Sequence, residues 1–309
     1  MSGTAFPTRL FIGIDGGGTN CRARIEDEAG RYLGAGAAGA AATRLGIDSS
    51  IAAITSASLA AIEDAGLGPE CLAQMHAGVG LAGIGRKGVL EELKRRDHPF
   101  RTLIFAGDAL IACLGAHNGN DGGIVIAGTG SVGFAIVNGR EHRIGGYGFP
   151  ISDEGSGAEI GLHAIRLSLR AHDQRIAETP LSRDLMSRFN NDAFAVVAWA
   201  ERATASEFAS FAPRVFAYAD DGDPLAERIV SNAARQVGAI VGKLAQITPR
   251  IALLGGLAAP LSKWLEPKVN QQLTPPAHDA VAGALLLARR DVICTRSREA
   301  AAAAAFTSS

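Results

Sequence analysis

The fold that we predict for this chain rests mainly on one stretch of sequence, Leu10-Phe11-Ile12-Gly13-Ile14-Asp15-Gly16-Gly17-Gly18-Thr19-Asn20. Its apolar half is as long as a buried β-strand, and it leads directly into a glycine turn. Because glycines carry no Cβ, the N–H groups of Gly16, Gly17 and Gly18 can close around phosphate oxygens. Thr19 adds a hydroxyl, and Asp15 at the strand end suits Mg²⁺, held directly or through water. An ordinary glycine-rich hairpin is the alternative, but this combination favours a phosphate loop.

A second loop of the same kind, Gly128-Thr129-Gly130-Ser131, follows the apolar run Gly123–Ala127. It again combines small residues with two hydroxyls, which a plain hairpin turn does not need. Each loop follows a strand and opens a similar succession of strands and helices. The sequence therefore predicts an α/β fold of two related domains with a ligand cleft between them.

The remaining elements follow from hydrophobic periodicity and turn residues. Further predicted strands are Arg22–Glu26, Arg31–Ala35, Met75–Leu81, Thr102–Ala106, Ser131–Val137 and Ile251–Leu254. Predicted helices are Ile47–Ala65, Gly88–Arg96, Ala109–Leu114, Ser156–Ala171, Pro224–Ile247 and Ala277–Arg289, with a mostly helical region before Ala219. Asn138-Gly139 predicts a hairpin turn, and Asp223 is expected to be the N-cap of the helix that begins at Pro224.

Asp108 follows a predicted strand, where a carboxylate would face the cleft and accept a proton from an attacking hydroxyl. An N-cap for the next helix explains it equally well, and both roles can hold at once. Asp153 has a similar pair of explanations: it can accept hydrogen bonds from sugar hydroxyls, or it can offset a helix dipole. Near it, Gly145-Gly146-Tyr147-Gly148 would let the backbone pass close to a ligand. Gly255-Gly256 would let an adenine ring lie against bare backbone, although a plain turn looks the same.

Composition excludes several other classes. The net charge of −1 gives no basic excess for nucleic acid, and no apolar run is long enough to cross a membrane. There is no Walker-type phosphate loop, and the G-x-G-x-x-G matches in a chain with 38 glycines do not lie in a dinucleotide-binding context. The four cysteines have no metal-binding or disulfide spacing. We expect a cytoplasmic protein with reduced thiols and no structural metal.

Together these motifs resemble those of the N-acetylglucosamine kinase and BadF/BadG/BcrA/BcrD-type ATPase family, which includes glucosamine kinases and belongs to the actin–hexokinase superfamily. The resemblance runs from Gly13 to about Arg289. It implies a two-domain actin-like ATPase (ribonuclease H-like) fold with a central ATP/sugar cleft. The implied domains are a sugar-side domain at 1–116 and a nucleotide-side domain at 117–278, with a helix at about 279–309 packing back on the first.

The resemblance also implies a reaction: phosphorylation of glucosamine or N-acetylglucosamine at the 6-hydroxyl by ATP with Mg²⁺. Asp108 would be the general base, and Asp15 would hold the metal. The implied ATP-binding residues are Asp15, Gly16, Gly17, Gly18, Thr19, Thr129, Gly130, Gly222, Gly255 and Gly256. The implied sugar-binding residues are Asp108, Ser131, Gly145, Gly146, Tyr147, Gly148 and Asp153. The expected partners are the sugar and ATP, with a homodimer as a possible assembly and no nucleic acid or membrane.

The sequence departs from this family at one place. Ala41-Ala42-Thr43 stands where the sugar kinases carry an Asn, which leaves the identity of the sugar open. Two other functions stay open as well. One is an activator-type ATPase that drives a reductase or dehydratase through an iron–sulfur cluster, for which Cys71 and Cys113 do not form a recognisable site. The other is a sugar sensor without catalysis, against which Asp15, Thr19 and Asp108 argue.

Overall fold

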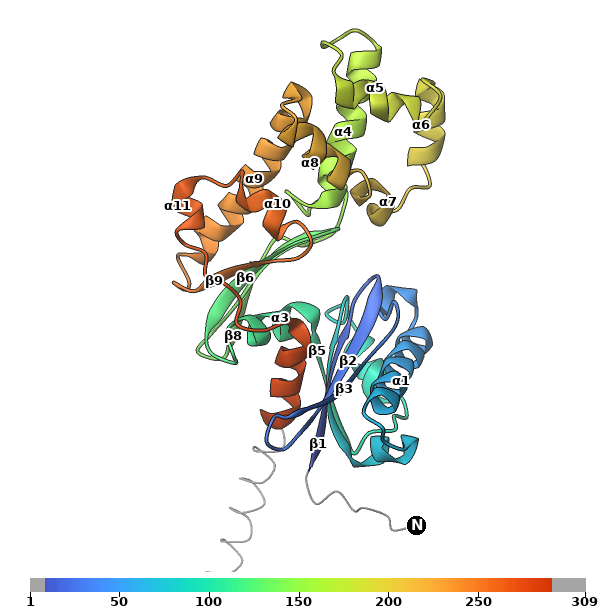
Figure 1. The fold of residues 1–309 in the computed structure, drawn as a ribbon, viewed down its shortest axis with the longest axis vertical. Helices are drawn as coiled ribbons and strands as arrows, with labels where there is room; N and C mark the ends of the chain where they lie inside the picture. The colour runs from blue at the N-terminus through green and yellow to red at the C-terminus, as the bar shows by residue number, and fades with distance from the viewer. Residues whose placement is uncertain (1–8, 291–309) are drawn as a thin grey trace, which may run out of the picture. The chain divides into compact units, whose positions relative to one another are not determined.

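The structure is a computed structural model that describes residues 9–290 (Figure 1). The chain divides into two compact units, an N-terminal unit of Met1–Asn120 with Pro276–Ser309 and a C-terminal unit of Asp121–Pro275. The boundaries predicted from the sequence lie after residues 116 and 278. Each unit contains its own β-sheet and helices, so the predicted α/β fold class is confirmed.

The N-terminal unit is built on a five-stranded sheet with the strand order β3-β2-β1-β4-β5. Its strands are β1 (Leu10–Gly16), β2 (Asn20–Asp27), β3 (Tyr32–Gly39), β4 (Met75–Leu81) and β5 (Thr102–Gly107). β2 runs antiparallel to its neighbours β1 and β3, whereas β1, β4 and β5 are parallel. The carboxyl ends of these three parallel strands therefore lie at one edge of the sheet.

The two faces of this sheet are covered differently. Ile12 and Ile14 are fully buried in a core that also contains Ala57 and Ala61 of α1 (Ile47–Asp64). On the other face, Phe11 packs against a helix formed by residues 280–290. The alternation of side chains along β1 thus buries both of its faces, as its continuous apolar run predicts.

Glycines allow the helix at residues 280–290 to approach the sheet closely. A Cβ atom at Gly13 would lie 2.5 Å from the carbonyl oxygen of Val281, and one at Gly78 would lie 2.1 Å from that of Ala284. Both distances are too short for any side chain. Gly13 and Gly78 are also direct partners in the β1–β4 pairing, so together they form a flat strip that seats the helix. The part of the predicted C-terminal helix beyond residue 290 lies outside the described residues.

The other helices of this unit connect its strands or follow the last of them. They are η1 (Thr43–Leu45), η2 (Pro69–Gln74), α2 (Val89–Lys94) and α3 (Asp108–Ala116). Of these, α3 follows β5 directly and contacts β1, β4 and β5. Among residues 9–290, no helix combines the length and apolar character needed to cross a bilayer.

The C-terminal unit has a four-stranded sheet with the order β8-β7-β6-β9. Its strands are β6 (Gly122–Ala127), β7 (Ser131–Val137), β8 (Arg140–Ile144) and β9 (Ile251–Leu254). Its helices are α4 (Gly157–His172), α5 (Pro180–Ser187), α6 (Ala193–Ala200), α7 (Ala205–Ala209), α8 (Ala212–Asp220), α9 (Pro224–Leu244), α10 (Ala258–Ser262) and α11 (Pro267–Asn270). The long helix α9 packs against β6, β7 and β8 and also against α4 and α8, so it is at the centre of this unit's core (Figure 1).

The buried side chain of Asp223 fixes the start of α9. One of its carboxylate oxygens accepts hydrogen bonds from the backbone N–H groups of Leu225 at 2.9 Å and Ala226 at 3.0 Å. The other accepts from the N–H of Leu181 at the start of α5, at 2.9 Å. The predicted N-cap is therefore confirmed, and the same carboxylate also joins two helices.

Candidate functional site

Two predicted site elements of the N-terminal unit meet at one sheet edge. The strand pairing aligns Gly16 at the end of β1 with Leu81 of β4, and Leu81 with Gly107 of β5. Asp15 precedes this row by one residue, and Asp108 follows it by one. Since neighbouring strands lie about 4.8 Å apart, the ends of β1 and β5 are separated by about 10 Å. The phosphate loop and the predicted base thus flank the end of β4.

The loop after β1 is anchored by backbone hydrogen bonds. The N–H of Gly17 donates to the carbonyl of Asn20 at 2.9 Å, and its carbonyl accepts from Ala41 at 3.0 Å. Gly18 and Thr19 at its tip are exposed. This anchoring holds the loop in one shape while leaving its tip accessible to a ligand.

The carboxylate of Asp15 accepts a hydrogen bond from the guanidinium of Arg22 across the β1–β2 pair at 2.7 Å. No group of three or more His, Cys, Asp or Glu side chains that could hold a metal occurs within residues 9–290. Mg²⁺ usually takes one or two carboxylates and completes its shell with water and substrate phosphates. The carboxylate of Asp15 fits an ion that needs so few protein ligands, and it does not fit a metal held by protein ligands alone.

Asp108 is the first residue of α3, so Gly107 occupies the N-cap position. Its carboxylate oxygen accepts a hydrogen bond from the next backbone N–H, that of Ala109, at 2.9 Å. The side chain is half-buried. This contact orients the carboxylate at the sheet edge, and an acid in the first turn also suits the helix dipole.

Thr43, the residue at the departure from the family pattern, has a structural role. Its side chain is buried, and its hydroxyl donates to the carbonyl of Ala82 at 3.2 Å while accepting from Arg86 at 3.0 Å. Both contacts tie the segment after β3 to the end of β4. The hydroxyl is therefore already used within the protein and does not replace the missing Asn amide.

In the C-terminal unit, the second loop and the glycine pair after β9 are adjacent. β6 and β9 pair in parallel up to Ile126 and Leu254, so Gly128 and Gly255 leave the sheet side by side. Gly255 has φ +96°, and a Cβ there would lie 2.3 Å from the carbonyl oxygen of Ala127. Only glycine fits this position, which brings the predicted phosphate and adenosine motifs of this unit together.

The second loop also contacts α4. The first N–H groups of this helix, those of Gly157 and Ala158, donate to the carbonyls of Gly128 at 2.8 Å and Thr129 at 3.1 Å. The side chain of Thr129 remains exposed. The helix thus holds the loop by its carbonyls and leaves the threonine hydroxyl available to a ligand.

Asp153 lies against the same loop in an unusual conformation. Its φ is +69°, which is uncommon for a residue with a side chain, and a Cβ at Gly130 would lie 2.5 Å from its carboxylate oxygen. The N–H of Gly148 donates to this carboxylate at 3.2 Å. Burial raises the pKa of Asp153 above its ordinary value, against the hydrogen bonds from Gly148 and Phe149 that lower it. A strained and partly desolvated carboxylate is typical of a functional position.

The other sugar-binding residues predicted in the C-terminal unit lie in the segments next to Asp153. Gly145, Gly146 and Gly148 all have positive φ, and the side chain of Tyr147 is 80% exposed. Ser131 is buried, and its hydroxyl donates to the carbonyl of Glu154 at 2.7 Å. Ser131 therefore shapes the segment that carries Asp153, a role that the sequence did not indicate.

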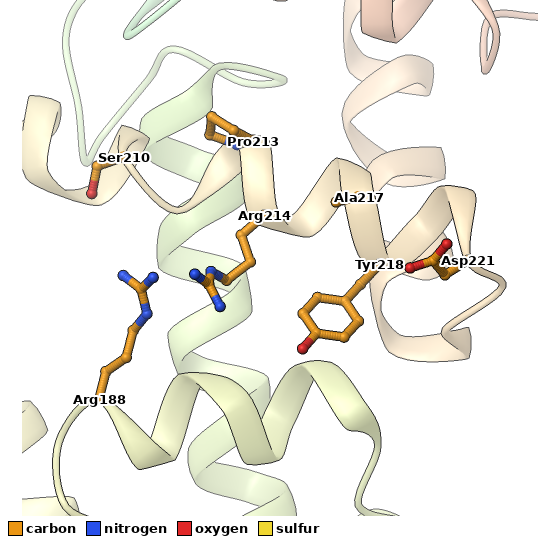
Figure 2. A pocket seen from close by; sticks show the side chains of 7 residues that line it. All are labelled: Arg188, Ser210, Pro213, Arg214, Ala217, Tyr218 and Asp221. Atoms are coloured by element: carbon orange, nitrogen blue, oxygen red, sulfur yellow. The ribbon is translucent and has the colours of Figure 1, made fainter.

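Gly222 lies in the turn between α8 and α9 with φ +81°. Asp220, two residues earlier, pairs with Lys263 just after α10 at 3.2 Å, so this turn is linked to the helix that follows Gly255-Gly256. A cavity of about 500 Å³ begins beside Gly222, at Asp221 and Tyr218. Figure 2 shows the side chains of Arg188, Arg214 and Tyr218 extending into one space. The sequence did not indicate this cavity. Its lining residues come from α8 and from the ends of α5 and α7, which only the fold brings together.

Known proteins are similar to this chain in sequence and in fold. The chain is 39% identical to the glucosamine kinase GspK of Vibrio cholerae over 279 residues, which cover 90% of this chain and 95% of that protein. It is 31% identical to an N-acetylmuramic acid/N-acetylglucosamine kinase of Clostridium acetobutylicum over 69% of this chain and 76% of that one. A crystal structure of a candidate N-acetylglucosamine kinase from Chromobacterium violaceum superposes with a TM-score of 0.84 at 37% identity, covering 91% of this chain and 99% of that one.

The family assignment follows from a match over nearly the whole described chain. Residues 12–288 match the model of one ATPase family, and this range includes β1 with its glycine loop and the helix at residues 280–290. The resemblance seen in the sequence motifs is thereby confirmed. The chain belongs to the BadF/BadG/BcrA/BcrD ATPase family.

Proposed function

We propose that this protein is an ATP-dependent sugar kinase that phosphorylates the 6-hydroxyl of glucosamine or N-acetylglucosamine. The observation that carries the proposal is the sheet edge of the N-terminal unit, where the Asp15 loop and Asp108 flank the end of β4. Membership of an ATPase family supports the use of ATP. The identity to a glucosamine kinase over 90% of the chain supports an amino sugar as the acceptor.

In this proposal each unit supplies a phosphate-binding loop, Gly16–Thr19 from one and Thr129–Gly130 from the other. Gly255, Gly256 and Gly222 bind the adenosine part of the nucleotide. Phosphoryl transfer needs little covalent chemistry from the protein, so catalysis rests on positioning and on stabilising the charge of the phosphoryl oxygens. Backbone N–H groups and hydroxyls of anchored loops supply both.

Asp108 acts as the general base. The oxygen of the sugar's 6-hydroxyl attacks the γ-phosphorus, and the bond from that phosphorus to the β–γ bridging oxygen breaks. The hydroxyl proton passes to the carboxylate of Asp108, and ADP leaves with the bond's electron pair. The hydrogen bond from the N–H of Ala109 orients this carboxylate at the start of α3.

The sugar is oriented by Asp153, with Gly145, Gly146, Tyr147 and Gly148 beside it and Ser131 supporting the segment. Asp153 accepts hydrogen bonds from sugar hydroxyls, which compensates for the burial of its charge. Asp15 would hold Mg²⁺, directly or through water, and the bound ion would neutralise phosphate charge. A cytoplasmic location and a homodimer are further parts of this proposal.

The activator-type ATPase is disfavoured by the cysteines. Cys21, Cys71 and Cys113 are all buried in the N-terminal unit, where no bridging iron–sulfur cluster could reach them. Burial, helped by the charge of Asp15, raises the pKa of Cys21 to about 12, so this thiol does not ionise readily as a ligand must. Cys294 lies outside the described residues.

The test is ADP release by the purified protein with Mg-ATP and a panel of glucosamine, N-acetylglucosamine, glucose and N-acetylmannosamine. We expect one of the first two to give the highest kcat/KM, and phosphorus NMR to find the product phosphate on the 6-oxygen. A 6-deoxy analogue of that sugar should bind without releasing ADP. ATP hydrolysis that ignores every sugar, by a brown protein with an iron–sulfur spectrum, would favour the activator instead.

A further inference from the structure

A second charged depression lies in the C-terminal unit between α4 and α9. We call it the α4–α9 groove; it encloses about 380 Å³ and is lined by none of the residues assigned above to ATP or sugar. Its lining residues come from one face of each helix. They are His163, Arg166, Leu167 and Arg170 of α4, and Arg228, Ile229, Asn232 and Arg235 of α9.

The groove gathers positive charge from both helices. Arg166 and Arg170 are four residues apart on α4, and Arg228 and Arg235 are seven apart on α9, so each pair projects from one helix face. All four side chains are exposed. Within residues 9–290 none of them forms an ion pair with a carboxylate, whereas Arg175, Arg183 and Arg214 of the same unit do.

The acidic residue Glu159 lies next to His163 at one end of the groove. One carboxylate oxygen of Glu159 accepts a hydrogen bond from the N–H of Gly155 at 2.5 Å. Its other oxygen lies 3.9 Å from Nε2 of His163. Glu159 therefore contacts the histidine and Gly155, and it forms an ion pair with none of the four arginines.

Repulsion between these arginines destabilises the fold when no ligand is bound. Like charges four residues apart destabilise a helix, and two packed helices bring a second set of like charges close to the first. A solvated helix face normally carries mixed signs. Here the charges instead surround a concave surface with an apolar floor of Leu167 and Ile229, which is the construction of a ligand site.

We propose that the α4–α9 groove binds a small anion that carries two or more phosphoryl groups. Arginine binds phosphoryl oxygens in a bidentate manner, and each phosphoryl group can engage two guanidiniums here. The seven residues from Arg228 to Arg235 rise about 10 Å along the helix, enough for two phosphoryl groups and too little for a polymer to follow. The net charge of −1 also argues against a nucleic acid surface.

The site can be tested by arginine protection. Inorganic pyrophosphate is the probe, and phenylglyoxal is the reagent that modifies accessible arginines. Peptide mass spectrometry should show that pyrophosphate protects Arg166, Arg170, Arg228 and Arg235, while exposed arginines outside the groove, such as Arg175 and Arg183, stay reactive. This readout reports on the groove itself, so pyrophosphate bound to the ATP loops does not confuse it.

Binding affinity gives a second measurement with matched controls. Arg166→Gln combined with Arg228→Gln should weaken the groove's affinity for pyrophosphate by about 100-fold, because two charged hydrogen-bonding partners are lost. The control is Arg175→Gln with Arg183→Gln, which removes two exposed arginines that pair with Asp173 and Glu178. It should leave the groove's affinity for pyrophosphate unchanged. Equal affinity in the two double variants would overturn the proposal. So would protection by an oligonucleotide or a polyglutamate but not by pyrophosphate, because the surface would then serve a macromolecule.

Discussion

Asp108→Asn is expected to reduce catalysis strongly while leaving the fold largely intact. The substituted amide cannot accept the hydroxyl proton, and general-base catalysis contributes roughly 10² to 10⁴ in rate. At about 1.4 kcal/mol for each factor of ten, the barrier should rise by about 3–5 kcal/mol. The carboxamide oxygen can still accept the hydrogen bond that Ala109 donates at 2.9 Å. The charge at the start of α3 is lost, which costs about 0.5–1 kcal/mol of stability through the helix dipole.

The assay is ADP release at saturating ATP and sugar, together with nucleotide affinity and thermal unfolding of the same preparations. We expect kcat to fall at least 100-fold, with the Kd for ATP changed less than about threefold. Asp108→Ala serves as the matched variant: it should lose as much activity and, in addition, the hydrogen bond to Ala109, so it should unfold at a lower temperature. Wild-type turnover in Asp108→Asn would refute the assignment of the base.

Three further changes test the C-terminal unit. Burial raises the pKa of Asp153, so its charged form opposes folding once the pH passes that raised pKa. Asp153→Asn should therefore have a Tm at or above that of the wild type at pH 7, and the difference in Tm should be smaller at pH 4. The KM for sugar should rise about tenfold. A Tm below the wild-type value at pH 7 would contradict the predicted effect on stability. Gly255→Ala places a Cβ 2.3 Å from the carbonyl of Ala127 at φ +96° and should cost about 2 kcal/mol, raising the KM for ATP more than that for sugar. Asp223→Ala leaves three N–H groups without their acceptor and should lower the unfolding free energy by about 3 kcal/mol in urea titrations, with little change in kcat for the folded fraction.

Local patterns predicted much of the secondary structure. The strands Met75–Leu81, Ser131–Val137 and Ile251–Leu254 have the bounds expected from the sequence, because glycines or turn residues punctuate each apolar run. The helix at Pro224 begins as predicted, since Asp223 and Pro224 together specify a helix start. The region before Ala219 was predicted only as helical. It forms four short helices whose limits depend on capping and on packing against α4 and α9.

The candidate site was predictable residue by residue but not as an arrangement. Glycine loops and acids at strand ends can be recognised locally, whereas the row that aligns Gly16, Leu81 and Gly107 depends on strand pairing between distant segments. Distant contacts also decide which hydroxyls remain available. The bond from Ser131 to the carbonyl of Glu154 spans 23 residues, and that from Thr43 to Ala82 spans 39, so no local pattern reveals them.

The packing of the helix at residues 280–290 against Gly13 and Gly78 has a consequence for biosynthesis. Part of one face of the first sheet stays uncovered while the ribosome makes the C-terminal unit, because the helix at residues 280–290 that covers it follows that unit in the sequence. Phe11 remains in water throughout that time. The nascent chain thus exposes an apolar surface that chaperones can bind. The N-terminal unit reaches its final stability only after synthesis has passed Arg290.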